Sequence, residues 1–379
     1  MEGEVVMAGG KVRRAPVLSW LGVGICIAVL VVMGMGCSGA EDGQPDEANS
    51  SQQEDVAVTG DTGTEEEMDV VTLKVVAAWP LQSDQDFLYH EYIDTVNVAA
   101  EKQGIPVRLE KTGGPEVVQA TQLFEAMGSG TIDMAYTSVD YYTGIVPEMG
   151  VLDSIKPDRE QYKQALAETD VMDELNGIME EKAQVRMLGL ALAVRGFKLL
   201  STKPVDGTDW GGLKVRAIGT PSARGIEAMG GSPVTIPSTE VFTSLEQGVV
   251  DAVIGTAMDR IGLGERDVYK YITLPPFTES ASGFFIGSDT WDDLSEETKT
   301  FLDSESKAFQ EWQYGWCEEK EQAAIDKYVE EDGVEIIEFT KEEQEKLGKA
   351  FRTGYLDYIV EESPAYGPQL KELVEPYVF

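Results

Sequence analysis

Short apolar segments that suit strands alternate along the chain with longer segments of helical periodicity. Residues 70–78 are mostly apolar, whereas residues 84–103 place their large apolar side chains near helical spacing. The same two patterns predict strands at 105–110, 132–136, 184–193, 268–273, 282–287 and 334–339, and helices at 114–127, 158–182 and 341–361. Strands that alternate with helices in this way are typical of βαβ units, so the predicted fold class is α/β.

An internal repeat links two parts of the chain. Residues 123–134 and 241–252 share a phenylalanine, a glycine that ends an amphipathic helix, and an aspartate at the start of a strand. The repeat predicts two similar α/β lobes, each presenting a strand end to a shared cleft. The aspartates of the two copies, Asp133 and Asp251, are expected to have structural rather than catalytic roles.

Three segments are expected to connect the lobes. The strand at 184–193 continues after a bend into 195–200, and 282–287 is a candidate second crossing strand. The apolar periodicity of 295–331 predicts a helix of roughly 50 Å, long enough to span both lobes. The predicted boundaries are 70–194 plus about 281–325 for the first lobe and 195–280 plus about 326–379 for the second.

The first 69 residues carry signals of export rather than of a core. Positive residues precede an apolar segment, 17–35, as in a signal peptide, which we place at 1–36. The small residues before Cys37 resemble a bacterial lipobox, which predicts cleavage and lipidation of Cys37; the alternative is an uncleaved anchor helix. Residues 37–69 are rich in acids and lack Lys and Arg, so they are predicted to form a disordered tether. Either way, the protein is expected to be exported and anchored to the membrane.

The charge and the rare residue types exclude several functions. Lys and Arg number 30 against 68 Asp and Glu, a net charge of −38, which argues against a nucleic-acid partner. His90 is the one histidine and no Gly-x-Ser-x-Gly elbow is present, so a catalytic triad is not expected. Cys317 is the one cysteine after the tether and is interpreted as a buried core residue. We expect no cofactor and no metal cluster.

The strongest candidate for binding chemistry is Arg216. Leu213, Val215 and Ala217 alternate with Lys214 and Arg216 in the pattern of a half-buried strand, and Gly219 ends it. Thr220 is predicted to be the N-cap of the next helix, with Pro221 at its first position. An arginine at a strand end beside a helix N-terminus can bind a carboxylate through two parallel hydrogen bonds. The alternative is an ordinary salt bridge at the strand end.

The segment around Arg216 resembles a known family. Gly212-Leu213-Lys214-Val215-Arg216, residues 226–234, Glu240-Val241-Phe242 and residues 245–251 together resemble the signature of dicarboxylate-type solute-binding proteins of tripartite ATP-independent periplasmic (TRAP) transporters. The resemblance covers about residues 70–375. It implies a two-lobed periplasmic-binding-protein fold whose cleft closes on a small organic acid and delivers it to a membrane permease driven by an ion gradient.

The resemblance also implies site residues. Arg216 matches the carboxylate-binding arginine of the family, and Ser238 and Thr256 fall at positions that line the cleft in relatives. Relatives often carry a second arginine after a glycine of the crossing strand; here Gly196 is flanked by Arg195 and followed by Lys198, so both become candidates. Some relatives bind a cation beside the acid, so a cation bound with the ligand stays open.

Aromatic residues at or just after strand ends are further candidates for the cleft. Trp79, Tyr136 and Tyr141 could cover an apolar part of a ligand, and core packing is the alternative for each. Two other functions compete with that of a receptor for transport. One is an exported hydrolase or lyase with paired carboxylates, for which the sequence shows no pair; the other is a ligand-sensing partner of a membrane receptor.

Overall fold

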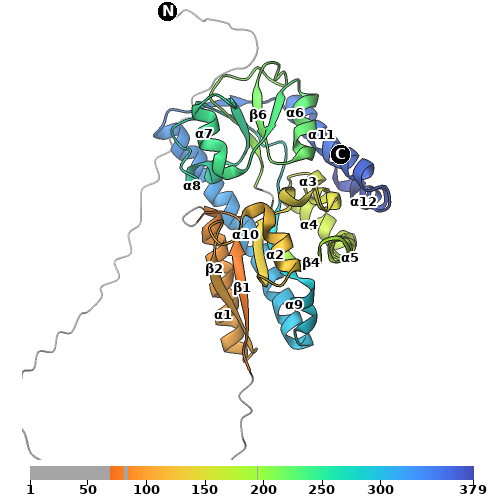
Figure 1. Cartoon of the computed structure of the whole chain (residues 1–379). Coiled ribbons are helices and arrows are strands. Elements are labelled where there is room, and N and C mark those ends of the chain that lie inside the picture. The colour runs from red at the N-terminus through yellow and green to blue at the C-terminus, as the bar shows by residue number, and fades with distance from the viewer. Residues whose placement is uncertain (1–68, 81–83, 194) are drawn as a thin grey trace, which may run out of the picture. The chain divides into compact units, whose positions relative to one another are not determined.

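The structure, a computed structural model, describes residues 69–80, 84–193 and 195–379 (Figure 1). The predicted signal segment, the lipidation site Cys37 and all but the last residue of the predicted tether lie outside these residues. No helix among the described residues is both long enough and apolar enough to cross a membrane.

The first lobe is built on a mixed sheet. Its strands occur in the order β2-β1-β3-β10-β4, with β1 parallel to β2 and β3, and β10 antiparallel to β3 and β4. The strands are β1 (Val71–Ala77), β2 (Val107–Gly113), β3 (Met134–Ser138), β4 (Val185–Leu192) and β10 (Ser282–Gly287). The helices and helical turns of this part of the chain are α1 (Asp84–Gln103), η1 (Ala120–Gln122), α2 (Leu123–Gly128), η2 (Val139–Tyr142), η3 (Pro147–Gly150), α3 (Val151–Ser154), α4 (Arg159–Glu168), α5 (Val171–Ala183) and α9 (Ser288–Asp293).

The second lobe is built on another mixed sheet. Its order is β11-β9-β5-β8-β6-β7, in which β6 is parallel to β7 and β8 whereas β5 is antiparallel to β8 and β9. The strands are β5 (Lys198–Ser201), β6 (Lys214–Ala217), β7 (Ser232–Thr235), β8 (Ala252–Gly255), β9 (Tyr271–Leu274) and β11 (Glu335–Glu338). The helices of this region are α6 (Thr220–Ala228), η4 (Ser238–Glu240), α7 (Val241–Glu246) and α8 (Ala257–Gly262). Two sheets with flanking helices confirm the predicted two-lobed α/β class.

The internal repeat has the same geometry in both lobes. Asp133 precedes β3 and accepts a hydrogen bond from the backbone N–H of Lys74 in β1 at 2.7 Å. Asp251 precedes β8 and accepts one from the backbone N–H of Lys214 in β6 at 3.1 Å. Each aspartate therefore fixes one strand to its parallel neighbour, which confirms the structural role predicted for both.

Two adjacent chain segments connect the sheets. One leads from β4 to β5 and the other from β9 to β10, and they pair antiparallel: the N–H of Phe197 donates to the carbonyl of Thr278 at 2.8 Å. Gly196 sits in the first segment with φ of +70°, and a Cβ there would lie 2.8 Å from the ring of Pro276. Glycine is therefore required where the crossing chain bends, as the sequence suggested.

The helix α10 (Glu296–Glu330) joins the two lobes along their length. Ser295 caps its start by accepting a hydrogen bond from the N–H of Thr298 at 3.1 Å. The helix packs against β4 of the first sheet and against α8 beside the second (Figure 1). Cys317, on this helix, is fully buried as expected, within the larger apolar core that also contains the first sheet.

Two predicted helices differ from the structure. The segment 114–127 is helical only in η1 and α2, because β2 continues to Gly113 and turns follow it. The segment 158–182 is divided into α4 and α5: Thr169 is extended (φ −122°, ψ 157°), and its hydroxyl takes the place of helical partners by donating to the carbonyl of Ala165 at 2.6 Å.

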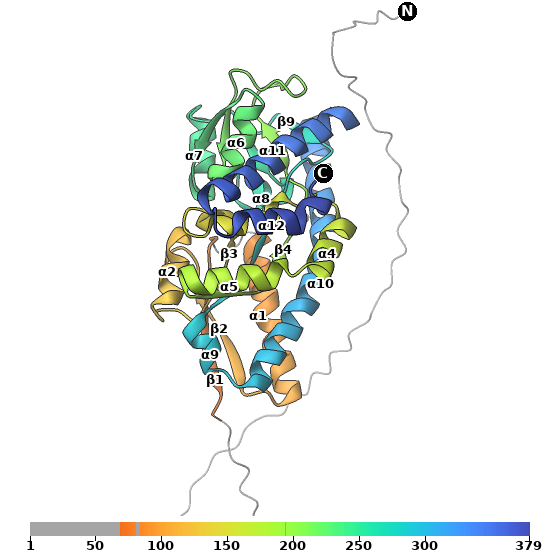
Figure 2. The same ribbon diagram turned by 90° about the vertical axis from the view of Figure 1, so that its right-hand side faces the viewer.

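The C-terminal helices pack against both lobes. The helix α11 (Lys341–Glu362) lies against α6 of the second lobe and α3 of the first, and α12 (Gly367–Val374) packs on α5 and α3, followed by the turn η5 (Glu375–Tyr377). Figure 2 shows these helices on the side of the folded part that faces the viewer. Tyr355 of α11 donates a hydrogen bond to Asp140 at 3.2 Å, a direct contact with the loop that follows β3.

Candidate functional site

A small cavity lies where strand ends of both sheets meet, and we call it the interlobe cavity. Its free volume is about 30 Å³, room for one or two water molecules. Its walls come from both lobes and from the connecting segments: Trp79, Ser138, Tyr141, Arg195, Phe197, Arg216, Ile218, Ser238, Ile254, Asp259, Arg260, Ser280 and Ser282. Of the residues proposed from the sequence, Arg216, Arg195, Ser238, Tyr141 and Trp79 are brought together here.

Arg216 is buried in this cavity without an acidic partner. Arg216 is 3% exposed, and its Nε donates a hydrogen bond to the backbone carbonyl of Ile236 at 3.0 Å. Among the described residues no carboxylate lies within salt-bridge distance of its guanidinium, so the alternative of a strand-end salt bridge is not realised there. Burial lowers the pKa of Arg216, and the nearby charge of Arg260 lowers it further. An arginine remains protonated at neutral pH, so the cavity contains a buried guanidinium charge that no carboxylate of the described residues contacts.

The helix that follows Arg216 starts differently from the prediction. Its N-cap is Gly219, in an extended conformation, and Thr220 is already helical. Ser222, in the first turn, reaches back instead: its Oγ accepts the N–H of Gly219 at 3.2 Å and of Ile218 at 3.1 Å. The strand end that carries Arg216 is thereby tied to the first turn of α6.

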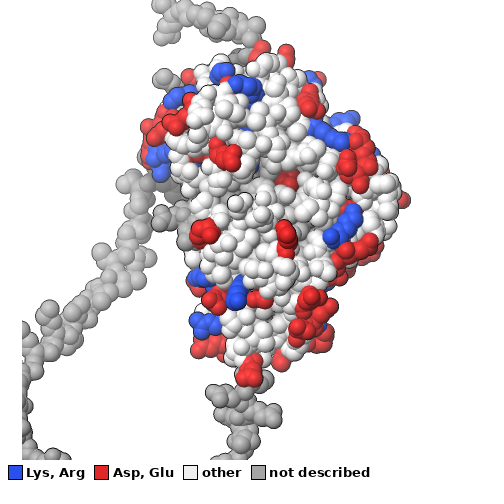
Figure 3. All heavy atoms as spheres, in the orientation of Figure 1, with Lys and Arg blue, Asp and Glu red and all other residues white. Residues whose placement is uncertain are grey.

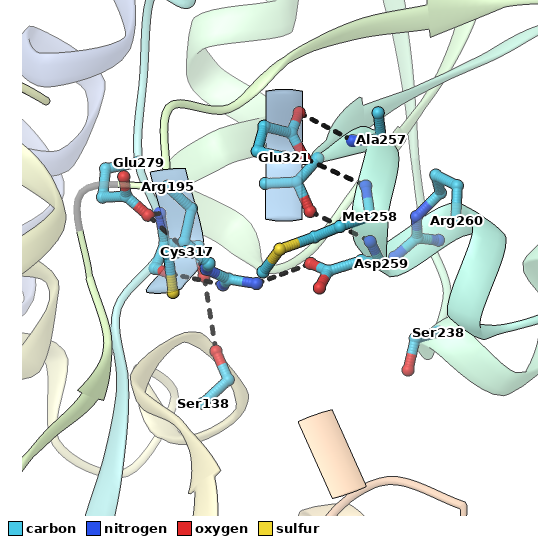
Figure 4. Close-up of polar contacts among 12 residues, drawn as sticks. Ser138, Arg195, Ser238, Ala257, Met258, Asp259, Arg260, Glu279, Cys317 and Glu321 are labelled. Atoms are coloured by element: carbon cyan, nitrogen blue, oxygen red, sulfur yellow. Dashed lines mark hydrogen bonds and ion pairs between the residues drawn. The ribbon is translucent and has the colours of Figure 1, made fainter. Parts of the chain in front are cut away.

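Two other arginines of the cavity are neutralised by acidic partners. Arg195 Nη1 donates to Asp259 Oδ2 at 2.5 Å and its Nη2 to the carbonyl of Ser280 at 2.8 Å (Figure 4). Arg260 Nη1 contacts both carboxylate oxygens of Glu265, at 3.1 and 3.2 Å. Burial lowers the pKa of each arginine, but the neighbouring carboxylates outweigh it and hold both pKa values above the ordinary one.

Three predicted site residues do not line the interlobe cavity. Lys198 is 1% exposed and its Nζ bonds to Glu321 of α10, because a buried ammonium needs a carboxylate partner. Thr256 caps α8, with its hydroxyl accepting the N–H of Asp259 at 3.3 Å. Tyr136 is fully buried and stacks on Phe284, with ring centres 4.8 Å apart, behind Trp79. The side chains of these three residues hold together elements of the fold in this structure.

The sequence reasoning missed several polar residues of the cavity, notably Ser138, Asp259 and Arg260. A signal for them was present in the repeat. Ser138 ends β3 and Thr256 follows the equivalent strand β8, and each hydroxyl accepts a backbone N–H of the next turn, from Asp140 at 3.4 Å and from Asp259 at 3.3 Å. Extending the repeat past the strands would have placed both following turns at the cleft.

A pair of buried carboxyl groups lies beside the cavity without lining it. Asp140 accepts hydrogen bonds from Ser280 Oγ at 2.7 Å and from the hydroxyl of Tyr355, whereas Asp153 accepts the N–H of Ala281 at 2.6 Å. Burial raises the pKa of both, and the negative charge of Asp140 raises the pKa of Asp153 further. Asp153 is therefore the member of the pair that holds a proton most readily.

The Asp153→Asn variant is expected to change how stability depends on pH. The pKa of Asp153 is higher in the folded chain than in the unfolded one, so its protonation stabilises the folded state. This stabilisation is fully present below about pH 4 and is lost as the pH rises through the pKa of Asp153 in the folded chain. The neutral amide does not titrate, so the melting temperature of the variant relative to wild type should rise between about pH 4 and pH 8. Melting curves across this range test it, with the exposed Asp173→Asn as the control; parallel pH profiles for Asp153→Asn and wild type would contradict it.

Acidic side chains dominate the exposed charge of the folded part, as the composition requires (Figure 3). The described residues contain no group of three or more His, Cys, Asp or Glu side chains that could hold a metal ion. The interlobe cavity contains one buried guanidinium, that of Arg216, which contacts no carboxylate of the described residues, with serine hydroxyls and aromatic rings around it.

Comparison with known proteins gives a consistent result. A solute-binding protein of Roseobacter denitrificans is 27% identical over 222 residues, which cover 57% of this chain and 66% of that protein, slightly less than two thirds of its length. The 2,3-diketo-L-gulonate-binding periplasmic protein of Escherichia coli is 26% identical over 261 residues, which cover 68% of this chain and 78% of that protein. Among solved structures, a TRAP periplasmic solute-binding protein from Desulfovibrio salexigens with bound orotic acid superposes with a TM-score of 0.72 at 15% identity, covering 81% of this chain and 98% of that chain.

The family model named "Bacterial extracellular solute-binding protein, family 7" (DctP) matches residues 97–362, well over half of the chain. Proteins of this family are solute-binding receptors rather than enzymes. The match includes both sheets except β1 and every residue of the interlobe cavity except Trp79. The chain therefore belongs to family 7 of the bacterial extracellular solute-binding proteins.

Proposed function

We propose that this protein is an extracytoplasmic receptor that captures a small organic acid in the interlobe cavity and delivers it to the membrane permease of a TRAP transporter. The observation that carries the proposal is Arg216, a buried guanidinium with no carboxylate partner among the described residues. The relative from E. coli is named for a sugar acid, and the structural neighbour from D. salexigens holds orotic acid. Both ligands bear a carboxylate, the group that a guanidinium binds best.

The charges of the cavity support a ligand with a single carboxylate. Arg195 is already paired with Asp259 and Glu279, and Arg260 with Glu265, so Arg216 supplies the guanidinium that no carboxylate contacts. A second carboxylate on the ligand would meet a neutralised surface and would lose its hydration without a matching partner. The hydroxyls of Ser138, Ser238 and Ser280 are placed to bind polar groups of the ligand, and Trp79 can cover its apolar part.

The small volume of the cavity supports a receptor that opens and closes. About 30 Å³ cannot accommodate an organic acid, so the lobes must separate to admit one. Tyr141 of η2 and Ser238 of η4 form a hydrogen bond of 3.2 Å between the lobes, and a ligand would replace or extend such contacts. We propose that closure moves 70–194 and about 281–325 against 195–280 and about 326–379, with the paired segments around Gly196 and Thr278 as hinge.

The proposed location follows from the N-terminal sequence and the family. Export by the signal segment 1–36 and lipidation of Cys37 would leave the folded part attached to the membrane surface by the acidic tether. Such a position keeps the receptor near its permease. A cation bound beside the ligand would need ligand oxygens in addition to protein groups, since the described residues offer no metal cluster of their own.

A thermal-shift screen of the full-length protein tests the proposal. The panel contains sugar acids, cyclic and linear monocarboxylates, dicarboxylates, and the amide of each acid as a neutral control. A ligand that binds only the folded state stabilises it by about 2.7 kcal/mol at 100 times its Kd. We expect a monocarboxylate to raise the melting temperature and its amide to have no effect. Stabilisation by neutral compounds alone would overturn the proposed carboxylate specificity.

A further inference from the structure

A second cavity shares no lining residue with the interlobe cavity. Its volume is about 250 Å³, and it is lined by three parts of the chain: the loop between α3 and α4 together with the first turn of α4, the segment that leads from β9 to β10, and α11. Charged and polar groups dominate its walls, among them Lys156, Asp158, Glu345 and Arg352. The helices α4 and α11 lie on the side of the folded part that faces the viewer in Figure 2.

Arg352 is the central feature of this second cavity. It is 4% exposed, and no hydrogen bond within the described part of the chain involves its guanidinium. The nearest acid is Glu345, whose Oε2 lies 3.7 Å from Nη2, beyond hydrogen-bond distance. Burial lowers the pKa of Arg352, with Glu345 opposing the shift. A buried guanidinium without hydrogen bonds is costly, so this site is suited to an external acceptor.

The neighbouring groups favour an anion as that acceptor. Lys156, partly buried, makes no ion pair within the described residues, so its ammonium group is free to contribute. Asp158 is already engaged, because its Oδ1 accepts the N–H of Gln161 at 2.9 Å as the cap of α4. The side chain of Glu345 is 55% exposed and can turn outward into water. An entering anion would meet Arg352 and Lys156 once Glu345 has turned outward, while the charge of Asp158 stays at the edge of the site as a cap of α4.

We propose that this cavity is a second anion site, which takes a small oxyanion such as phosphate with Arg352 as the principal donor and Lys156 as the second. Oxyanions accept several hydrogen bonds at once, and a planar guanidinium matches their geometry. The site adjoins Phe277, in the segment that connects the two sheets, so an occupant would sit next to the proposed hinge. The proposal does not depend on the receptor function.

Calorimetric titration of the full-length protein with inorganic phosphate tests this site, with chloride holding the ionic strength constant. Wild type should bind phosphate saturably, and Arg352→Leu should weaken binding at least about tenfold through loss of a charge-assisted contact. Lys156→Ala should weaken it about threefold, whereas Glu345→Gln should tighten it by a similar factor because the competing carboxylate is removed. Arg216→Ala, which alters only the interlobe cavity, should leave phosphate binding unchanged.

The variants separate the outcomes. Melting curves identify any variant that fails to fold. If Arg352→Leu does not fold, Glu345→Gln still tests the proposal, because it changes an exposed side chain. No saturable phosphate binding by wild type or by Glu345→Gln would overturn the proposal. Binding that persists in Arg352→Leu but disappears in Arg216→Ala would place the anion in the interlobe cavity and would overturn it as well.

Discussion

Arg216→Ala is expected to weaken binding of the organic acid strongly, raising its Kd by at least about 30-fold. A carboxylate bound by a buried guanidinium is desolvated, and removal of the arginine leaves it without its partner, a loss of about 2–5 kcal/mol. Isothermal titration with the acid found in the ligand screen measures this effect. Arg216→Lys should give an intermediate affinity, because the positive charge remains but the two parallel hydrogen bonds are lost.

The fold should survive the substitution of Arg216. Its guanidinium forms one hydrogen bond, to the carbonyl of Ile236, and no ion pair within the described residues, so its removal relieves a desolvated charge and exposes no opposite one. Lys214→Ala is the matched control on the same strand, since Lys214 lies on the same face of β6 and its Nζ donates to the carbonyl of Gly248. A folded Arg216→Ala variant with wild-type affinity would refute the assigned role.

Glu321→Ala is expected to be the most destabilising substitution of a charged residue, lowering the free energy of unfolding by about 3–5 kcal/mol. The carboxylate of Glu321 accepts the N–H groups of Ala257 and Met258 at 2.9 Å each (Figure 4). It also pairs with Lys198. The variant would leave a buried ammonium and two buried N–H groups without partners. It would also break the link between α10, α8 and β5.

Urea denaturation at neutral pH measures this effect. Glu319→Ala, an exposed position on the same helix, is the control and should change the free energy of unfolding by less than about 0.5 kcal/mol. Adding Lys198→Met to Glu321→Ala should restore part of the lost stability, because the unpaired charge is removed. Equal stability of Glu321→Ala and the control would show that Lys198 finds another partner.

The elements with strong local signals could be predicted from the sequence. The helix α1 has the predicted bounds, and α10 matches within one residue at each end, because Ser295 is a strong cap and the apolar positions continue without proline. The repeat predicted the two lobes because its glycines and aspartates have local roles in each copy. Thr169 shows the limit: a hydroxyl that bonds backward can end a helix inside an uninterrupted pattern.

Residues of the interlobe cavity could be predicted from the sequence only where their position along a strand determines that they reach the cavity. Arg216 and Trp79 reach the interlobe cavity because they end or follow strands that meet there. Lys198 could not be assigned, because its partner Glu321 is 123 residues away in sequence and no local pattern links them. Arg195 lines the interlobe cavity, but its pairing with Asp259, 64 residues away, depends on the tertiary fold.

A crystal structure of the protein with the acid from the screen tests the central claim most directly. We expect the ligand carboxylate to receive two hydrogen bonds from the guanidinium of Arg216, in a cavity that retains the Arg195–Asp259 and Arg260–Glu265 pairs. A ligand whose carboxylate displaces Asp259 or Glu265 from its arginine, or that leaves Arg216 without an acidic contact, would contradict the account.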